Sequence, residues 1–483
     1  MRSMRESESS HNSYDVVILG AGPAGAATAL ALKRLDSTLR IALVERSDYS
    51  AIRIGETLPP PARTLLTELG VWQAFLATSP RACYGTRAAW GSPQFHENEF
   101  IFSPYGYGWH LDRRAFDAML TAEAARRGVE VIQPATISTA SRCENDWILI
   151  NAEEHGRKIR TRFVVDATGR RSWLASHLGI RRLVYDQLVG IFNFYQFHSG
   201  SAPADSYTSI EACEQGWWYA AMLPDEGLAV AFMTDADQLR RLRWKDCDEW
   251  RALLGTAPNI ARQIGTATPL GRPMLHTAAS QRLDTCTGDG WLAVGDAAST
   301  FDPLSSQGII KSLRSGICAA RSICRSLRGH RNALAEYADF VEREYRNYLD
   351  SRAGYYRLEQ RWPDSRFWQQ RQEQIHLDPQ RMLRLLSPHP VNLDRMAMRL
   401  PRQQVRSLLS LCATPRKASE VVTEFHVQTE RRYSDRDVVL TLQALIAQNV
   451  LSTSAGTDYP KLAMHSHFQQ EEIHAIYVDD QHQ

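Results

Sequence analysis

The chain has 483 residues, of which 56 are basic, 54 acidic, 43% hydrophobic and 23% charged, and its formal charge is +2 at pH 7. This composition is typical of a globular protein and excludes a disordered, collagen-like or low-complexity chain. Because the net charge is close to zero, no overall field favours nucleic acid as a partner. The eight cysteines form no C-x-x-C pair, so we expect neither a metal site nor a redox dithiol.

The first part of the chain gives an expectation about its location. Residues 1–13 are polar, and nowhere do about 18 apolar residues run together. We therefore expect a disordered tail at 1–13, a cytoplasmic protein and no membrane partner.

A nucleotide-binding motif begins directly after the tail. The apolar run 14–19 is followed by G-x-G-x-x-G and by helix-forming residues 24–35, and a second strand, 40–44, ends at Glu45. Glycines between a strand and a helix let a pyrophosphate approach the backbone at the helix N-terminus. Glu45 is placed for an adenosine ribose. The predicted cofactor contacts here are Gly20, Gly22, Pro23, Ala24, Gly25, Glu45 and Arg46.

A second signal downstream favours FAD as the cofactor. Asp296 ends a strand and suits a ribityl chain, and the segment 302–308 leads into a helix over 308–327 whose N-terminus can stabilise a reduced flavin. Arg113 has the fork geometry for phosphate oxygens, with a salt bridge to Asp117 as its alternative role. These predicted flavin contacts are Arg113, Asp296, Pro303, Gly308 and Ile309.

The order of patterns predicts an α/β fold with three domains. A Rossmann-like, doubly wound FAD-binding domain is expected at 14–182 and 286–375. An antiparallel β-sheet substrate domain is inserted at 183–285, with parts of 80–112. A mainly helical, winged-helix-like domain is expected at 376–465, with a helical stretch at 380–411 broken by prolines, a capping box at 434–437 and a final tail at 466–483.

With the further motifs at 55–59, 112–117 and 166–169, the sequence from 14 to 375 resembles the flavoprotein monooxygenases and flavin-dependent halogenases. The resemblance implies that reduced FAD reacts with O2 to form a C4a-hydroperoxyflavin, which delivers an electrophilic oxygen. No second G-x-G-x-x-G occurs, so NAD(P)H bound transiently or a separate reductase is expected to supply electrons.

Residues that halogenases are expected to carry are missing from this chain. The resemblance implies a lysine after the Gly55-Glu56 motif, but no lysine lies between Lys33 and Lys158, and Arg87 is too firmly protonated to replace it. The halogenase pattern Trp-x-Trp-x-Ile-Pro reads Trp-Trp-Tyr-Ala-Ala-Met-Leu-Pro at 217–224, and tryptophan halogenases place a glutamate where Ser305 stands. Hydroxylation is therefore favoured over halogenation.

Within the monooxygenases, the segments 84–92, 216–219, 302–308 and 361–368 resemble the flavoproteins that mature tryptophylquinone enzymes, in particular the quinohemoprotein amine dehydrogenase type. The resemblance implies one or two hydroxylations of a tryptophan in a small partner protein, on which the C-terminal domain would dock. The alternative is a hydroxylase or halogenase of a free or carrier-bound aromatic metabolite. A flavin-bearing regulator that reads DNA is a third reading.

Oxygen transfer to an indole needs a dry pocket beside the flavin. We expect aromatic walls from Tyr105, Trp109, Trp217, Trp218 and Tyr219, although an aromatic stripe on a strand also packs in cores. Glu56 and His110 are the candidate catalytic residues. Their alternative roles are a turn cap for Glu56 and a packed side chain for His110.

Overall fold

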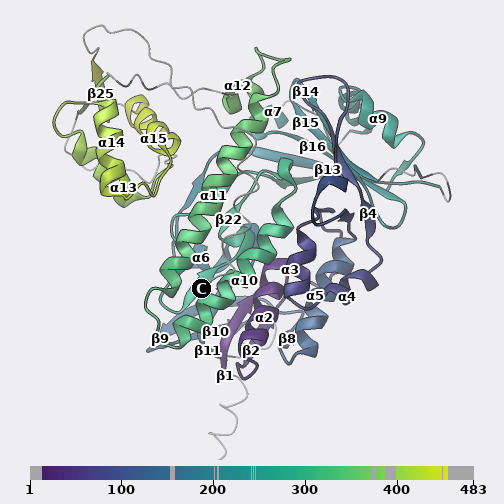
Figure 1. Cartoon of the computed structure of the whole chain (residues 1–483), viewed down its shortest axis with the longest axis horizontal. Helices are drawn as coiled ribbons and strands as arrows, with labels where there is room; N and C mark the ends of the chain where they lie inside the picture. The colour runs from purple at the N-terminus through teal and green to yellow at the C-terminus, as the bar shows by residue number, and fades with distance from the viewer. Residues whose placement is uncertain are drawn as a thin grey trace, which may run out of the picture.

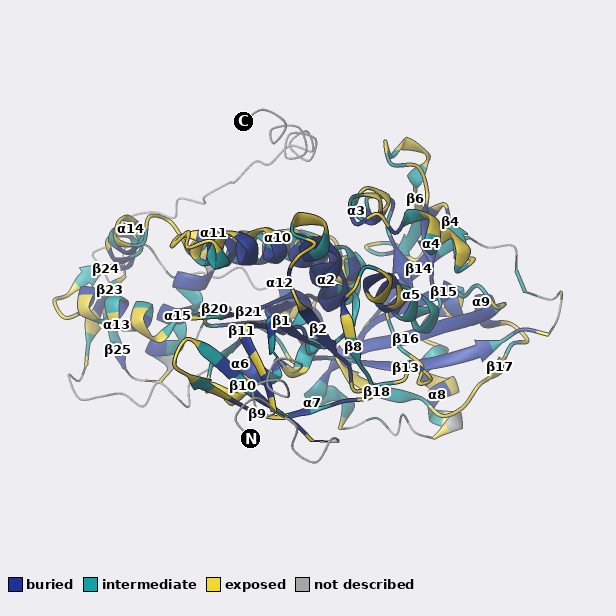
Figure 2. Cartoon of the chain, turned by 90° about the horizontal axis from the view of Figure 1, so that it is seen from below, coloured by how far each residue is buried: buried dark blue, intermediate teal, exposed yellow. Residues whose placement is uncertain are grey.

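The computed structural model describes residues 13–454 except 153–157, 199, 201, 204–205, 241, 243, 245, 373–376, 378, 380, 387–398 and 449. The predicted tail 466–483, residues 1–12 and the proline breaks at 388 and 390 lie outside the described residues. Ser13 already belongs to the first strand, so ending the predicted tail at 13 was wrong by one residue. Figure 2 shows the first sheet between the C-terminal helices and the inserted sheet.

The first sheet has the doubly wound order that the sequence predicted. Its strands run in the order β20-β21-β11-β1-β2-β8, and β8, β2, β1, β11 and β21 are parallel to one another, whereas β20 and β10 add antiparallel pairs. Leu19 pairs with Val44 and Asp166, so the carboxyl ends of three strands meet at one edge. The elements are β1 (Ser13–Leu19), α2 (Pro23–Leu35), β2 (Ile41–Val44), β8 (Glu130–Ile132), β9 (Ile137–Cys143), β10 (Asp146–Asn151), β11 (Lys158–Asp166), β20 (Thr287–Gly288) and β21 (Trp291–Ala293).

Long helices pack closely on one face of this sheet. Figure 2 shows α2 with α10 (Gly308–Leu327) and α11 (Ala333–Arg357) on the same side. A Cβ added at Gly316 of α10 would lie 2.7 Å from the carbonyl oxygen of Ala24 in α2. Small residues therefore set the spacing of the two helices that flank the edge of the sheet.

The inserted domain is a large sheet in the order β17-β13-β16-β15-β14-β5-β6, with β18 on β13. Its pairs are antiparallel except β14 with β5, which are parallel. Strand alternation sends one row of aromatic residues toward α11 and α12 and the other under α8 and α9. The elements are β5 (Gly85–Ala89), β6 (His96–Glu99), β13 (Leu188–Gln196), β14 (Tyr207–Cys213), β15 (Gly216–Met222), β16 (Gly227–Asp235), α8 (Cys247–Leu254), α9 (Pro258–Ile264), β17 (Thr268–Pro269), β18 (Met274–Thr277) and α12 (Arg366–Gln372).

Shorter elements connect the two sheets. Strands β3, β7 and β4 form a small sheet in that order, and β12, β19 and β22 form another. Helix α5 begins after Asp112, whose side chain caps it by accepting the Arg114 N–H. These elements are β3 (Thr57–Leu58), α3 (Ala62–Glu68), α4 (Trp72–Ala77), β4 (Arg81–Cys83), η1 (Phe100–Phe102), β7 (Gly108–His110), α5 (Arg113–Arg126), η2 (Gly169–Arg171), α6 (Trp173–His177), β12 (Arg182–Val184), α7 (Ala236–Leu239), β19 (Gln281–Leu283), η3 (Gly295–Ala297), β22 (Ser299–Thr300) and η4 (Pro303–Ser305).

The C-terminal region has a hydrophobic core of its own and lies at one end of the molecule (Figure 1). The helical prediction for 380–411 was wrong at its start, because β23 pairs with β24 and β25 there. Ser434 accepts the Asp437 N–H, as the predicted capping box requires. The elements are β23 (Met382–Leu385), α13 (Arg402–Leu411), β24 (Arg416–Lys417), α14 (Ala418–Gln428), α15 (Asp435–Ala447) and β25 (Leu451–Ser454).

The part of the chain that the structure describes supports neither a membrane-spanning helix nor a metal site. None of its helices is both long and apolar enough to cross a bilayer. Its acidic, histidine and cysteine side chains form no cluster of three or more suited to a metal ion.

Candidate functional site

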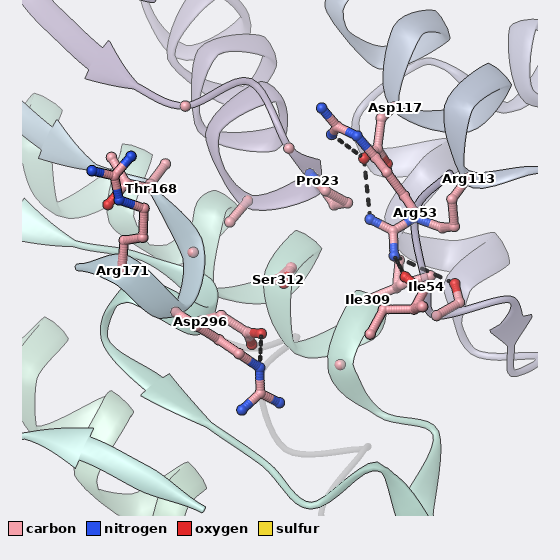
Figure 3. Close-up of a pocket in the computed structure, with 18 of the residues that line it drawn as sticks. Pro23, Arg53, Ile54, Arg113, Asp117, Thr168, Arg171, Asp296, Ile309 and Ser312 are labelled. Carbon is pink, nitrogen blue, oxygen red and sulfur yellow. Dashed lines mark hydrogen bonds and ion pairs between the residues drawn. The ribbon is translucent and has the colours of Figure 1, made fainter. Parts of the chain in front are cut away.

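A cavity of about 600 Å³ opens at the carboxyl edge of the first sheet and reaches the inserted sheet. Figure 3 shows side chains from α2, α5, α10 and the segments after β2, β11 and β21 around it. Most residues predicted to bind the cofactor line this cavity, together with two residues predicted for catalysis or substrate: Gly20, Gly22, Pro23, Ala24, Glu45, Arg46, Arg113, Asp296, Pro303, Gly308, Ile309, Glu56 and Tyr219.

The three glycines of the motif have different environments. Gly20 has a φ of +103°, and a Cβ there would lie 2.4 Å from the Ala167 carbonyl oxygen. A Cβ at Gly25 would lie 1.9 Å from the Gly20 carbonyl oxygen, so Gly25 serves the packing of helix and turn and does not line the cavity. A Cβ at Gly22 would meet nothing within 4 Å. The backbone at Gly22 is therefore open to a close ligand.

Glu45 anchors the glycine turn to the end of β2. Its Oε2 accepts the Ala21 N–H at 2.7 Å, and its Oε1 accepts from the Ser47 N–H at 2.9 Å and the Ser47 hydroxyl at 2.6 Å. Arg46 is exposed at the rim. The carboxylate is thus held in place at the cavity, where its contact with a ribose stays a prediction.

Two arginines share one buried carboxylate at the same end. Asp117 Oδ2 lies 2.7 Å from Arg53 Nη1 and 3.1 Å from Arg113 Nη2. Burial opposes the charge of Arg113, but Asp117 outweighs it, so the pKa of Arg113 is raised. The salt bridge between Arg113 and Asp117, which the sequence offered as the alternative role of Arg113, is therefore present. Arg53 Nη2 also lies 3.5 Å from Glu45 Oε1, so the two guanidinium groups are balanced by two carboxylates. Their forked N–H donors suit the oxygens of a pyrophosphate. Nothing in the sequence reasoning identified Arg53.

Asp296 is held by a lysine that the sequence reasoning missed. Lys311 Nζ lies 2.7 Å from Asp296 Oδ1, and Arg170 Nε lies 3.7 Å from Oδ2. Burial alone would raise the pKa of Asp296, but Lys311 and Arg170 lower it below its usual value. The aspartate therefore stays ionised as a hydrogen-bond acceptor at the cavity. The sequence did offer one signal for this contact, because Lys311 lies three residues after Gly308, in the first turn of α10.

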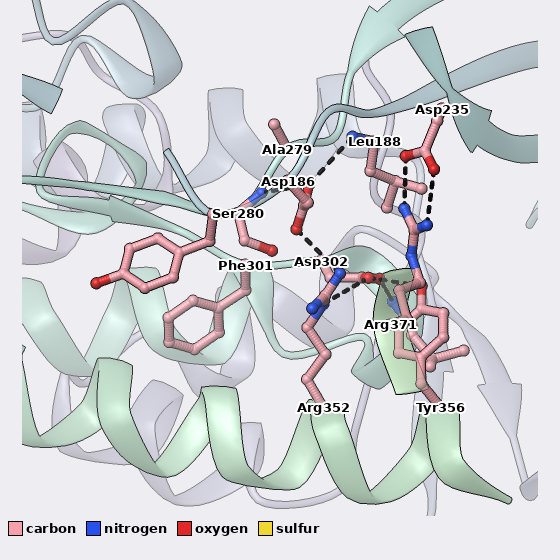
Figure 4. Close-up of polar contacts among 12 residues, drawn as sticks. Asp186, Leu188, Asp235, Ala279, Ser280, Phe301, Asp302, Arg352, Tyr356 and Arg371 are labelled. Carbon is pink, nitrogen blue, oxygen red and sulfur yellow. Dashed lines mark hydrogen bonds and ion pairs between the residues drawn. The ribbon is translucent and has the colours of Figure 1, made fainter. Parts of the chain in front are cut away.

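The loop 302–308 is fixed from behind by α11 (Figure 4). Asp302 Oδ2 accepts from the Tyr356 hydroxyl at 2.7 Å and from Arg352 Nε at 3.1 Å. Arg352 Nη2 also lies 3.0 Å from Asp186 Oδ2. All four side chains are largely buried, so removing one partner leaves a buried charge unpaired. This network holds Pro303 and Gly308 at the cavity wall.

Glu56 lies where the nucleotide-binding half meets the inserted sheet. Its side chain is buried, and burial raises the pKa of its carboxyl group despite the charge of Arg113. Tyr219 donates to Glu56 Oε2 at 3.5 Å, and Thr57 Oγ1 lies 2.8 Å from the Tyr219 hydroxyl. A buried acid of this kind favours the protonated form, which the turn-cap alternative does not require.

His110 is fully buried on β7 and does not line the cavity. Burial and, to a lesser extent, the charge of Arg81 lower its pKa to about 3. Its Nε2 lies 2.9 Å from Thr208 Oγ1. A neutral, packed histidine is therefore the state at neutral pH, and any effect of His110 on the cavity passes through Thr208.

Four of the five predicted aromatic wall residues lie elsewhere. Trp217 packs in the aromatic cluster with Trp90 and donates to the Tyr356 hydroxyl at 3.0 Å. Trp218 faces the opposite side of the sheet, against Trp250, because neighbouring strand residues alternate. Trp109 packs against helix α4, and Tyr105 does not reach the cavity either. Phe192, together with Tyr219, forms the aromatic wall instead.

These residues fit FAD. The open backbone at Gly22 and the guanidinium groups of Arg53 and Arg113 suit a pyrophosphate, and the ionised Asp296 suits a ribityl chain. The helix α10 begins at Gly308 on the same wall. The cavity lining therefore offers polar partners for the pyrophosphate and the ribityl chain of a dinucleotide.

Comparison with known proteins agrees with this fit. The model of the tryptophan halogenase family matches residues 15–103 and 80–397. A protein named as an FAD-dependent oxidoreductase, LodB of Marinomonas mediterranea, is 32% identical over 366 residues, which are 74% of this chain and 97% of that protein. A brominase of 1H-pyrrole-2-carbonyl carrier protein from Pseudoalteromonas luteoviolacea is 26% identical over 67% of this chain and 80% of the enzyme. The structure of the myxobacterial chondrochloren halogenase CndH shares the fold, with a TM-score of 0.67 at 24% identity over 74% of this chain and 86% of that one.

Proposed function

The chain belongs to the tryptophan halogenase family of FAD-dependent enzymes, and within it we propose a monooxygenase that hydroxylates a tryptophan side chain of a partner polypeptide. The observation that carries this proposal is the cavity wall, where Glu56 and Tyr219 stand and no lysine is among the described lining residues. A buried lysine that relays hypohalous acid is what the resemblance to halogenases requires. Arg87, the nearest base in sequence, binds Ser209 instead and does not line the cavity.

The residues present define how FAD would be held. Gly22 and the N-terminus of α2 would bind the pyrophosphate with Arg53 and Arg113, and Asp296 would bind the ribityl chain. Bound FAD supplies the activation of O2, with electrons from NAD(P)H or a reductase. Phe192 and Tyr219 exclude water from the side where the substrate enters.

A polypeptide substrate accounts for the separate C-terminal region. That region has its own buried core and contacts the rest of the chain through Arg399, which donates to the Tyr185 carbonyl at 2.6 Å. A small protein that carries the target tryptophan would dock there and receive one or two oxygen atoms. We place this modification in the cytoplasm.

The test is the intact mass of small proteins that co-purify with this chain, before and after reductant and O2 are supplied. A gain of one or two oxygen atoms on a tryptophan peptide supports the proposal. A partner of unchanged mass, with peroxide accumulating, contradicts it.

Halogenation of a free or carrier-bound aromatic is the second candidate, favoured by the family match and by the carrier-protein brominase among the relatives. Repeating the assay with bromide and aromatic acids, free and carrier-bound, separates the two. Incorporation of bromine into such an acid, with no oxygen added to a protein, establishes this alternative.

A further inference from the structure

Glu56 and His110 are the two ends of one buried series of hydrogen bonds, here called the hydroxyl chain. His110 Nε2 lies 2.9 Å from Thr208 Oγ1, which lies 2.8 Å from Thr57 Oγ1. Thr57 Oγ1 lies 2.8 Å from the Tyr219 hydroxyl, and this hydroxyl donates to Glu56 Oε2 at 3.5 Å. All five side chains are buried, so water does not compete for these bonds.

The unpaired atoms indicate the direction of donation along the chain. His110 Nδ1 and Glu56 Oε1 are buried without a hydrogen-bond partner among the described residues. An unpaired buried N–H is rarer and costlier than an unpaired acceptor, so the imidazole proton lies on Nε2 and is donated to Thr208. Each hydroxyl then donates to the next, and Tyr219 donates to Glu56 Oε2. The proton of a neutral Glu56 is left on Oε1, which is buried and has no hydrogen-bond partner among the described residues.

We propose that Glu56, which lines the cavity, is the general acid of oxygen transfer and gives its proton to an oxygen bound there, while the hydroxyl chain stabilises the carboxylate that remains. This inference rests on the proposed function. The charged and titratable groups around it are Arg113 from α5 and Tyr219 from β15, with Cys83 beside Tyr219 and Arg81 beside His110. Burial, which opposes the charge of Arg113, raises the pKa of Glu56 and so favours the neutral acid.

The proton balance closes on Glu56 itself. Bound FAD would supply, from O2 and a reductant, an oxidant at the peroxide level. As the indole ring carbon takes one oxygen of its O–O bond, Glu56 would give its proton to the other oxygen, which keeps the electron pair of the broken bond. The ring carbon then loses its hydrogen as a proton to the Glu56 carboxylate, and the C–H electron pair restores the aromatic ring. No proton needs to pass to His110, whose low pKa makes it a poor acceptor. His110, Thr208 and Thr57 are therefore positioning residues.

The experiment uses the FAD-loaded enzyme and compares E56Q, T208V and a matched control, T234V. Thr208 lies outside the cavity lining, and Thr234 is a buried threonine of the same sheet that donates to the Gln215 carbonyl. Infrared difference spectra between wild type and E56Q should show the carbonyl band of a protonated carboxyl group at neutral pH. That band should move in T208V and stay in place in T234V.

The reaction itself supplies a second readout. E56Q should slow oxygen addition about 100-fold or more and divert turnover to peroxide. The wild-type rate should fall as pH rises through the pKa of Glu56, and T208V should shift this fall to higher pH, because the carboxylate loses support. E56D should recover part of the rate.

Several outcomes would overturn the inference. They are the absence of a protonated carboxyl band that E56Q removes, an E56Q rate equal to wild type, or the same pH profile in T208V and T234V. If the wild type adds no oxygen to any partner, the proposed function has failed. The infrared comparison on the loaded enzyme then still decides whether Glu56 is a neutral acid tuned by the hydroxyl chain.

Discussion

The two ends of the cavity bury polar groups in opposite ways. At the nucleotide end, Arg53, Asp117 and Arg113 form ion pairs of 2.7 and 3.1 Å. At the inserted-sheet end, Glu56 is followed by uncharged hydroxyl groups and a neutral imidazole. Binding an anionic cofactor requires charges that exist beforehand, whereas donating a proton requires an acid that has kept it. The difference therefore separates a binding end from a reacting end.

The largest effect is expected at the binding end. D117N removes the carboxylate that two arginines share and should lower the free energy of unfolding by about 3–5 kcal/mol in the FAD-free protein, because buried cations lose their partner. Urea denaturation measures it. Saturating FAD should recover part of the loss, since its pyrophosphate supplies another anion. The matched control is D248N, whose ion pair with Arg251 is exposed; equal losses in the two variants would contradict the description of this end.

The glycine turn offers a sharper test of the same end. G25A places a Cβ against the Gly20 carbonyl oxygen and should destabilise the protein by about 1–3 kcal/mol. G22A has space for its Cβ in the FAD-free protein, so its stability should stay close to wild type while its affinity for FAD falls. Thermal unfolding and FAD fluorescence titration measure the two effects. A G22A protein that binds FAD normally would show that the cofactor does not approach this backbone.

The neutral His110 at the reacting end should make the free energy of unfolding depend on pH. The pKa of His110 is lowered to about 3, so the unfolded chain binds more protons below the ordinary value of 6.5. The contribution of neutral His110 to the free energy of unfolding is complete above about pH 6.5. It is lost as pH falls toward 3, by up to about 1.4 kcal/mol per pH unit. Urea midpoints between pH 4.5 and 7 should show a shallower slope in H110Q. The exposed His330 provides the control, H330Q, which should keep the wild-type slope.

The smallest effect is the loss of one hydroxyl group. Y219F removes a partner from Thr57 and from Glu56 and should lower the free energy of unfolding by about 1 kcal/mol. Tyr345 has a buried hydroxyl without a partner among the described residues, so Y345F should be neutral or slightly stabilising. Chemical denaturation of both variants makes the comparison. Equal losses would mean that the hydrogen bonds of the Tyr219 hydroxyl do not stabilise the protein.

Short-range patterns predicted much of the binding end. The glycines at 20–25, the acid Glu45 after the second strand and the loop 302–308 before a helix are local signals, and all but Gly25 line the cavity. The predicted aromatic wall shows the limit of such patterns. Trp217, Trp218 and Tyr219 are neighbours in sequence, but the pleat sends Trp218 to the opposite face, and only Tyr219 reaches the cavity.

The sequence by itself determined the glycine turn and the separate motifs predicted to contact FAD, because each motif consists of residues that are close together in the chain. The tertiary structure alone decided which polar groups meet at each end of the cavity. Thr57 lies 151 residues from Thr208 and 162 from Tyr219, and Asp117 lies 64 residues from Arg53. Hydrogen bonds and ion pairs of this range depend on how the inserted sheet closes against the first domain, and no local periodicity encodes that closure.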